Sequence, residues 1–318
     1  MKKVPLTDVK LYTQGSLKEK EEFIKVFGHS LQEFGFVIIE GHNISANLIN
    51  ESYTLIKEVF SLPIENKLKY VENSGLGQRG YVHFGLEHAK NSFKGDLKEF
   101  WHIGREHFLD EKFKNEYAKN IWPDSHLPHF KPKILDLYNK LDQLSQILLS
   151  SLSEYLNLPK YTLPQMAMDG NSVLRALHYP PLKQEQFSSG AVRAAAHEDI
   201  NLITILCEAT ESGLEILTRK GHWLEIECKQ GQMIIDSGDM LSRITNNVIP
   251  STTHRVINPK GIQNVSRYSM PFFVHAFEKC ELNVLENCKS PSKPTLYPPI
   301  LANEFLLQRL RENGLGKI

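Results

Sequence analysis

The chain has 318 residues, of which 41% are hydrophobic and 23% are charged, values that are typical of a globular protein. Its 37 basic residues balance its 37 acidic ones, so no positive excess indicates a nucleic acid or an anionic membrane as partner. The apolar runs are all much shorter than the roughly 20 residues of a membrane-spanning helix. No apolar segment follows the N-terminal MKKVPLTDVK, so we expect neither a membrane span nor a signal peptide.

The N-terminal half of the chain is predicted to be largely helical. Gly35 ends the first helix, and the apolar FVIIE at 36–40 is typical of a buried strand. Ser45 is the expected N-cap of the second helix. Residues 72–95 hold five of the nineteen glycines, which favours a loop. The three predicted helices cover residues 17–34, 45–62 and 131–156.

After Leu163 the pattern changes to short β-rich segments separated by turn residues. Within them, TRKGHW is typical of a hairpin tip and DSGD of a tight turn. Closely spaced strands of this kind indicate an antiparallel sandwich or jelly roll, and ANEFLLQRLRENG near the C-terminus returns to helix. We therefore expect one α+β unit: a helical N-terminal region, residues 1–160, packed on a β core with a C-terminal helix, residues 161–318. The β-rich segments are NSVLRALHY, AAHEDINLITILCE, LEILTRKGHWLEIE, GQMIIDSGDMLSRITN, THRVIN and RYSMPFFVH.

Charged side chains stand at the head of the strongly apolar run AAAHEDINLITIL. Burying charge beside a core is costly unless the charge is paired, hydrated or bound to a metal. Positions i and i+2 of a strand share a face, so His197 and Asp199 can converge on one ion while Glu198 points away. His254, at the start of another predicted strand, is the best candidate for a third ligand.

Each of these residues also has a simpler interpretation. An isolated His-x-Asp is common, and a lone His254 is more often a core or surface histidine than a ligand. His222, in KGHW, lies at a predicted turn and ranks below His254. Taken together, two histidines and one carboxylate form the ligand set of non-haem Fe(II) oxygenases. That set leaves three coordination positions open for oxygen and a co-substrate.

Arg267 and Ser269 in SRYSMPFF also stand two residues apart on a predicted strand. A guanidinium is a rigid fork of donors that matches a carboxylate, and a serine hydroxyl adds a further bond. The flanking aromatic and apolar residues indicate that Arg267 is buried. It then either forms a core salt bridge with an acid of the protein or binds the carboxylate of a ligand. Tyr179 in LHYPP is another candidate donor, and by strand alternation Asn171 and Arg175 share its face.

These motifs, in this order, resemble the isopenicillin N synthase-like family of Fe(II)- and 2-oxoglutarate-dependent oxygenases over nearly the whole chain. The resemblance implies a double-stranded β-helix, a jelly-roll barrel with iron at its mouth. The matching segments are FGFVIIEGH, GQRGYVHFGLEHAK, DLKEFWHIG, LRALHYPP, HEDINLITIL, THRVINP and RYSMPFF. The implied iron ligands are His197, Asp199 and His254, and the implied carboxylate clamp consists of Arg267, Ser269 and Tyr179.

The activity implied by the resemblance is that of a dioxygenase that uses Fe(II), 2-oxoglutarate and O2. Such an enzyme hydroxylates, desaturates or cyclises a small-molecule substrate and releases succinate and CO2. Tyr81, Arg175 and Phe273 are expected to line the substrate side, where Arg175 either suits a carboxylate-bearing molecule or forms a structural ion pair. Two alternatives stay open: an isopenicillin N synthase-type oxidase that needs no 2-oxoglutarate, and a non-redox jelly roll that binds a carboxylate ligand.

Two positions depart from the family pattern. Leu177 stands where many plant members have Asn, which argues against a plant-type substrate pocket, and the connection from His254 to Arg267 is slightly long. The cysteines show no CxxC spacing, which favours reduced thiols in a cytoplasmic protein. We expect no nucleic-acid or membrane partner, and a monomer or weak homo-oligomer. The four cysteines are Cys207, Cys228, Cys280 and Cys288.

Overall fold

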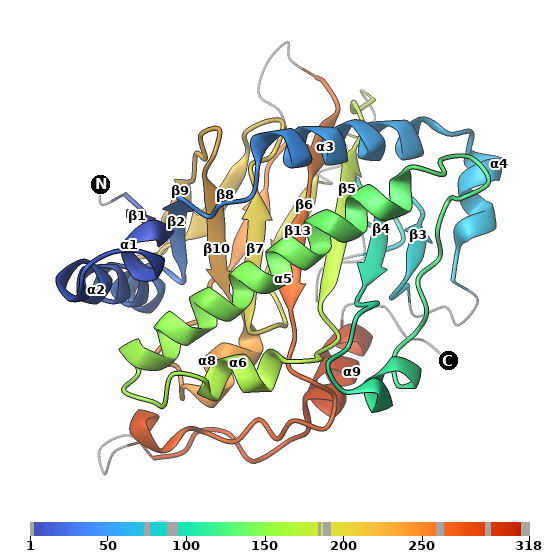
Figure 1. The fold of residues 1–318 in the computed structure, drawn as a ribbon. Coiled ribbons are helices and arrows are strands. Elements are labelled where there is room, and N and C mark those ends of the chain that lie inside the picture. Colours follow the sequence, from blue (N-terminus) through green and yellow to red (C-terminus); the bar gives the residue numbers. More distant parts are fainter. Residues whose placement is uncertain are drawn as a thin grey trace.

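Two β-sheets face each other, and a layer of helices covers the outer face of the larger sheet (Figure 1). The long helix α5, Phe130–Tyr155, runs across that face, and α3, Ala46–Ser61, packs beside it. The computed structural model describes residues 3–72, 77–87, 95–183, 186, 192–258, 264–289 and 294–312.

The larger sheet joins strands from both halves of the chain in the order β1-β2-β10-β7-β13-β5-β4-β3, and β12 also pairs with β5. Only β1 and β2 are parallel among its described pairs. Because β2 pairs directly with β10, the N-terminal region supplies part of the core sheet itself. The bounds are β1 Leu6–Asp8, β2 Phe36–Glu40, β3 Gly80–Val82, β4 Glu99–Gly104, β5 Val173–Tyr179, β7 Ile203–Cys207, β10 Met233–Ser237, β12 Arg267–Ser269 and β13 Pro271–Val274.

The smaller sheet has the order β6-β11-β8-β9 and is antiparallel throughout its described pairs. The β8–β9 hairpin closes at the predicted TRKGHW tip, where the Thr218 N–H donates to the His222 carbonyl at 2.9 Å. This sheet carries two of the residues expected to bind metal. Its strands are β6 Ala194–His197, β8 Leu214–Leu217, β9 Trp223–Glu225 and β11 His254–Val256.

The remaining helices complete the fold, and none of the helices within the described ranges is long and apolar enough to cross a membrane. The C-terminal helix α9 lies at the end of the sheet opposite the α3 side of the molecule (Figure 1). The remaining α-helices are α1 Val9–Thr13, α2 Leu17–Phe34, α4 Ile64–Lys67, α6 Thr162–Ala167, α8 Asp239–Ile244 and α9 Ala302–Glu312. The 3-10 helices are η1 Leu68–Tyr70, η2 Glu111–Asn115 and η3 Glu286–Cys288.

One apolar core joins the helical layer to the larger sheet. The buried face of α5 includes Tyr138, whose ring meets the ring of Phe272 on β13 edge-on, with centroids 5.0 Å apart. The Tyr138 hydroxyl donates to the Ser172 carbonyl at 2.8 Å, so this buried polar group is satisfied. The helix that was predicted over 131–156 thus fixes the position of the sheet that carries the site.

The predicted helices at 17–34, 45–62 and 131–156 are confirmed, with shifts of no more than one residue at their ends. The prediction of a loop over 72–95 is wrong in part, because it contains β3, and β4 was not predicted. These two strands are buried along their whole length, so they lack the alternating pattern that marks a half-exposed strand.

Two predicted strands in the C-terminal half are also wrong in detail. AAHEDINLITILCE folds as two strands, β6 and β7, which belong to different sheets, and the chain crosses between the sheets at 198–202. The second part of GQMIIDSGDMLSRITN forms the helix α8 instead of a strand. In both segments polar residues divide the apolar residues into short runs, with HED in the first segment and DSGD in the second. A short apolar run does not separate strand from helix by its period alone.

Gly28→Ala tests the contact between α2 and α5. A Cβ at Gly28 would lie 2.1 Å from the Tyr155 ring, so either this side chain or the helix that carries it must shift. Ala gains up to about 1 kcal/mol of helix propensity over Gly, but overpacking costs about 1–3 kcal/mol. We therefore expect a net loss in the free energy of unfolding, measured by urea denaturation. Glu22→Ala, on the exposed face of α2, is the control, and a Gly28→Ala protein as stable as that control would contradict the prediction.

Candidate metal centre and co-substrate pocket

The smaller sheet places His197 and His254 side by side. His197 is the last residue of β6 and His254 the first of β11, and the two residues are paired across the antiparallel strands. Their ring centroids are 4.4 Å apart. Asp199 lies in the segment after β6, not on the strand, so the predicted i, i+2 geometry within one strand is wrong. The carboxylate nevertheless reaches both histidines because the chain turns there towards β7.

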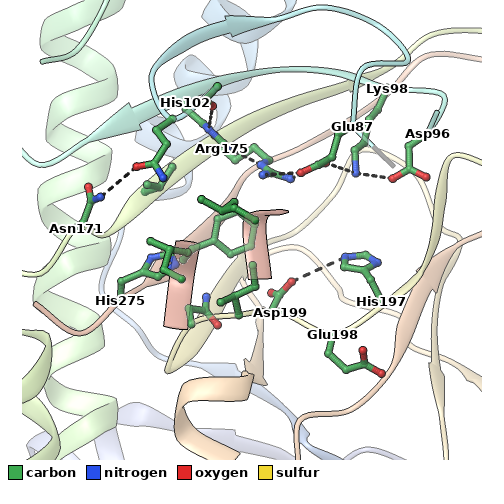
Figure 2. Close-up of a pocket in the computed structure, with 18 residues that line it drawn as sticks. Glu87, Asp96, Lys98, His102, Asn171, Arg175, His197, Glu198, Asp199 and His275 are labelled. Atoms are coloured by element: carbon green, nitrogen blue, oxygen red, sulfur yellow. Dashed lines mark hydrogen bonds and ion pairs between the residues drawn. The ribbon is translucent and has the colours of Figure 1, made fainter. Parts of the chain in front are cut away.

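The three side chains converge on one point. The Nε2 atoms of His197 and His254 each lie 3.8 Å from Asp199 Oδ1, and one ligand atom from each residue lies within 4.8 Å of the others. Figure 2 shows His197 and Asp199 directed towards each other, whereas the Glu198 carboxylate points elsewhere, as predicted. The Glu198 carboxylate accepts a hydrogen bond from the Thr253 hydroxyl.

The backbone selects the tautomer of each imidazole. The Nδ1–H of His197 donates to the Ala195 carbonyl at 2.7 Å, and the Nδ1–H of His254 donates to the Thr252 carbonyl at 3.2 Å. A carbonyl only accepts, so the proton sits on Nδ1 and the Nε2 lone pair is free to face Asp199. Two imidazole lone pairs and one carboxylate oxygen on the same side are the donor set of a transition-metal site, so these residues fit an iron ion.

Burial controls the charge of this cluster. Burial lowers the pKa of His254 to about 4, and the nearby His197 adds to the effect, so His254 is neutral at pH 7. Asp236 Oδ2 lies 3.6 Å from His254 Nδ1. Burial, with the neighbouring Asp199 and Asp239, raises the pKa of Asp236 well above its usual value. The raised pKa of Asp236 favours its uncharged form beside the neutral imidazole of His254.

A short hydrogen-bonded chain orients Asp199. The Thr204 hydroxyl donates to Asp199 Oδ2, and Asn201 Nδ2 donates to Thr204 Oγ1 at 2.8 Å. Oδ2 is therefore engaged, and Oδ1 is the oxygen that faces the histidines. Thr204 and Asn201 were not identified from the sequence. They lie within HEDINLITIL, but nothing in their type or spacing separates them from ordinary turn and strand residues.

Arg267 and Ser269 lie on β12, which pairs with β5 so that Arg267 is opposite Tyr179. The Arg267 guanidinium carbon lies 5.2 Å from the centre of the Tyr179 ring. Arg267 is 2% exposed, its Nε donates to the Glu211 carbonyl at 3.0 Å, and its Nη1 is buried without a hydrogen-bond partner. Among the described residues, Arg267 forms no salt bridge with an acid, so the structure does not support the core ion pair considered above.

One pocket between the two sheets contains both groups of residues. Its wall is otherwise mainly apolar, with residues from β2, β5, β7, β8, β10 and β11. A buried cation with a free donor therefore shares a cavity with the two histidines and the aspartate. The predicted residues that line this pocket are His197, Asp199, His254, Arg267, Ser269, Tyr179, Arg175 and Phe273.

A second, wider pocket also includes His197 and Asp199 in its lining (Figure 2). Phe273 and Arg175 line it, as predicted. Arg175 forms an ion pair with Glu87 at 3.1 Å, so of its two interpretations the structure shows the ion pair. The predicted residue Tyr81 lines neither pocket, because it is buried and its hydroxyl donates to Glu99 at 2.5 Å.

Sequence and structure comparisons identify the family. Residues 4–125 match the model of the non-haem dioxygenase in morphine synthesis N-terminal family, and residues 170–276 match the 2OG-Fe(II) oxygenase superfamily. The 2-oxoglutarate-dependent dioxygenase ucsF of Acremonium sp is 30% identical over 96% of this chain and 98% of its own length. The chain belongs to the 2OG-Fe(II) oxygenase family.

Solved structures agree with this assignment. A putative 2OG-Fe(II) oxygenase family protein from Caulobacter crescentus is 41% identical, with a TM-score of 0.87, and the match covers 98% of this chain and 99% of that one. The full-length T7H of Neurospora crassa in complex with alpha-KG is 26% identical, with a TM-score of 0.86, and covers 97% of this chain and 95% of its own. The predicted α+β fold with a double-stranded β-helix core is therefore confirmed.

The enzyme is a non-haem dioxygenase that depends on Fe(II) and 2-oxoglutarate, uses O2 and releases succinate and CO2, as the sequence predicted. The named relatives and the alpha-KG complex favour this reaction over both alternatives, the oxidase without 2-oxoglutarate and the non-redox jelly roll.

Thr204→Val tests the hydrogen bond that orients Asp199. Valine keeps the shape of the side chain but donates no hydrogen bond, so Asp199 can rotate away from the histidines. Loss of such a supporting bond lowers metal affinity by about 10–100-fold, which an anaerobic calorimetric titration with Fe(II) measures. Thr218→Val removes a hydroxyl at the exposed tip of the β8–β9 hairpin and serves as the control. Equal Fe(II) affinity in the two variants would show that Thr204 does not orient the carboxylate.

Proposed function

We propose that His197, Asp199 and His254 hold the Fe(II) of this dioxygenase, and that Arg267, Ser269 and Tyr179 hold the distal carboxylate of 2-oxoglutarate. The observation that carries the proposal is the buried, unpartnered Nη1 of Arg267 in the same pocket as the two histidines and the aspartate. When bound, the iron supplies the activation of O2 that is coupled to the decarboxylation of 2-oxoglutarate.

The residues of the chain then have separate tasks. The backbone acceptors of His197 and His254 fix the tautomer with the proton on Nδ1, so both imidazoles offer their Nε2 lone pairs without moving. Arg267 supplies a fixed, buried positive charge that is left without an acid partner, which suits a dicarboxylate co-substrate. The apolar residues around it exclude water from that charge pair, and a hydrogen bond between ions is stronger when it is shielded from solvent.

For the substrate we propose a small molecule that enters through the wider pocket, past Arg175 and Phe273. The T7H of Neurospora crassa has also been solved with thymine, at 25% identity, and a relative at 30% identity is named a proline hydroxylase. Both names refer to small molecules. Tyr81 does not share this proposed role, because its hydroxyl is engaged by Glu99.

Further proposals concern the setting of the enzyme. The balanced charge gives no support for a nucleic-acid or membrane partner, and the lack of CxxC spacing among the four cysteines supports a cytoplasmic protein. The oligomeric state, a monomer or weak homo-oligomer, stays a prediction. The division of the chain into regions 1–160 and 161–318 also stays a prediction.

Substitution of the proposed iron ligands is the direct test. His197→Ala and Asp199→Ala each remove one donor, so we expect both to abolish Fe(II)-dependent release of CO2 from labelled 2-oxoglutarate while the unfolding temperature changes little. His222→Ala, at the exposed hairpin tip, is the control and should keep full activity. Retention of Fe(II)-dependent CO2 release in either ligand variant would refute the assignment.

Arg267→Ala tests the clamp separately from the metal. Removing one partner of a buried charge pair costs about 2–5 kcal/mol, so the affinity for 2-oxoglutarate should fall by that amount while Fe(II) affinity is kept. Anaerobic absorbance titrations of the Fe(II) protein with 2-oxoglutarate measure the change. Arg255→Ala, which breaks a pair with Glu215 outside the pocket, is the control. An unchanged affinity for 2-oxoglutarate would mean that another group binds the carboxylate.

A further inference from the structure

Four charged side chains form a continuous chain along one wall of the wider pocket (Figure 2). Both Nη atoms of Arg175 donate to the Glu87 carboxylate, at 3.1 and 3.2 Å. Lys98 Nζ lies 2.7 Å from Glu87 and 2.8 Å from Asp96. Lys98 and Asp96 are buried, and Arg175 and Glu87 are nearly so. Two positive charges thus meet two negative charges, and the sum is zero.

Arg175 has little capacity left for a ligand. Its Nε donates to His102 Nε2 at 2.6 Å, and the Nδ1–H of His102 donates to the Gly77 carbonyl at 2.7 Å, so this imidazole is neutral. The guanidinium also lies over the ring of Phe100, at 4.2 Å, and near that of Phe273, at 5.1 Å. Each of its three nitrogens already has a partner, and its charge is already matched.

Apart from the acids Glu198 and Asp199, the rest of the described wall is neutral or apolar. The amides of Gln78 and Asn171 and the imidazole of His275 line it, together with Phe273 and the α9 leucines Leu306 and Leu310. Nδ1 of His275 is buried without a hydrogen-bond partner, and the residue is 8% exposed. Glu198, the remaining charged residue apart from Asp199, is directed to Thr253. The wall thus offers hydrogen bonds without net positive charge.

We infer that the substrate of this enzyme is an uncharged, planar polar molecule with amide-like donors and acceptors, and not a carboxylate. The inference rests on the proposed function of the pocket. A carboxylate would lose its hydration in a pocket whose cations are both occupied by acids, and burial of an unpaired charge is strongly unfavourable. Asn171 Oδ1 already accepts from Arg79, and Asn171 Nδ2 donates to Gln78 Oε1 at 3.4 Å. A neutral amide would therefore use the hydrogen-bonding capacity that remains on these two amides, together with Nδ1 of His275, and pack against Phe273. This reverses the expectation that Arg175 suits a carboxylate.

Three probes of equal shape separate charge from size: benzamide, benzoate and benzamidine, which are neutral, anionic and cationic. Their binding is measured by ligand-observed NMR with protein that is saturated with Mn(II) and 2-oxoglutarate, so that the Arg267 clamp is occupied. Benzamide should bind best, and benzoate should bind at least about fivefold more weakly because its lost hydration is not replaced. If benzamide does not exceed both charged probes, the inference is overturned.

Glu87→Gln should invert this preference. It leaves the charge of Arg175 partly unmatched, so the affinity for benzoate should rise by about tenfold while that for benzamide stays within about twofold. Glu116→Gln breaks the pair with Lys279 away from the pocket and should keep the ranking of the normal enzyme. An unchanged benzoate affinity in a folded Glu87→Gln protein overturns the inference, and if that variant does not fold, the ranking in the normal enzyme decides.

The same samples separate the two levels of the proposal. Failure of Mn(II) and 2-oxoglutarate together to raise the unfolding temperature would refute the proposed function. A normal response to both, with benzoate bound as well as benzamide, would refute only the inferred substrate class.

Discussion

The pairing of β6 with β11 is the constraint on which the rest of the site depends. It sets His197 opposite His254, and a slip of one residue would turn one imidazole to the other face of the sheet. The register has support on both sides, because β11 also pairs with β8, where His254 lies opposite Ile216 in the apolar interior. The register that buries these apolar side chains therefore also brings the two lone pairs together.

The segment after β6 must then hold the carboxylate in place without strand pairing. The first turn of α8 does this with its backbone: the N–H of Asp239 donates to the Asp199 carbonyl at 2.7 Å, and the N–H of Gly238 donates to the Leu202 carbonyl at 3.0 Å. A Cβ at Gly238 would lie 2.3 Å from the Asn201 carbonyl oxygen, so only glycine allows this approach. The DSGD sequence thus serves as a support for the metal side of the pocket.

The sequence was informative for features that residue type or a long amphipathic period specifies. The donor atoms of His197, Asp199 and His254 are identified by residue type, and the long amphipathic period of α5 predicts its helix. The geometry of Asp199 could not be predicted. A His-x-Asp motif that lies wholly on a strand has the same sequence as one whose aspartate lies beyond the end of the strand. β3 and β4 were missed since both are fully buried and therefore show no alternation of polar and apolar residues.

Whether a charged residue has an acid partner within the protein was the hardest property to predict from the sequence. Arg267 and Arg175 both lie on strands beside aromatic residues, yet Arg267 lacks an acid partner in the described chain and Arg175 has one. The difference comes from Glu87, which lies between β3 and β4 and far from Arg175 in sequence. Long-range pairing of this kind leaves no local signal, and it decides whether an arginine offers its charge to a ligand or to the protein.

The C-terminal helix connects these elements to the substrate side. Arg309 of α9 forms an ion pair with Asp239 at 2.6 Å, while the backbone of Asp239 holds the Asp199 carbonyl. On the same helix, Leu306 and Leu310 line the wider pocket. One residue at the start of α8 thus links the segment that carries the carboxylate to the helix that forms the apolar wall. The metal centre and the substrate pocket are therefore supported by the same residue. A displacement of α9 would change the position of both through Asp239.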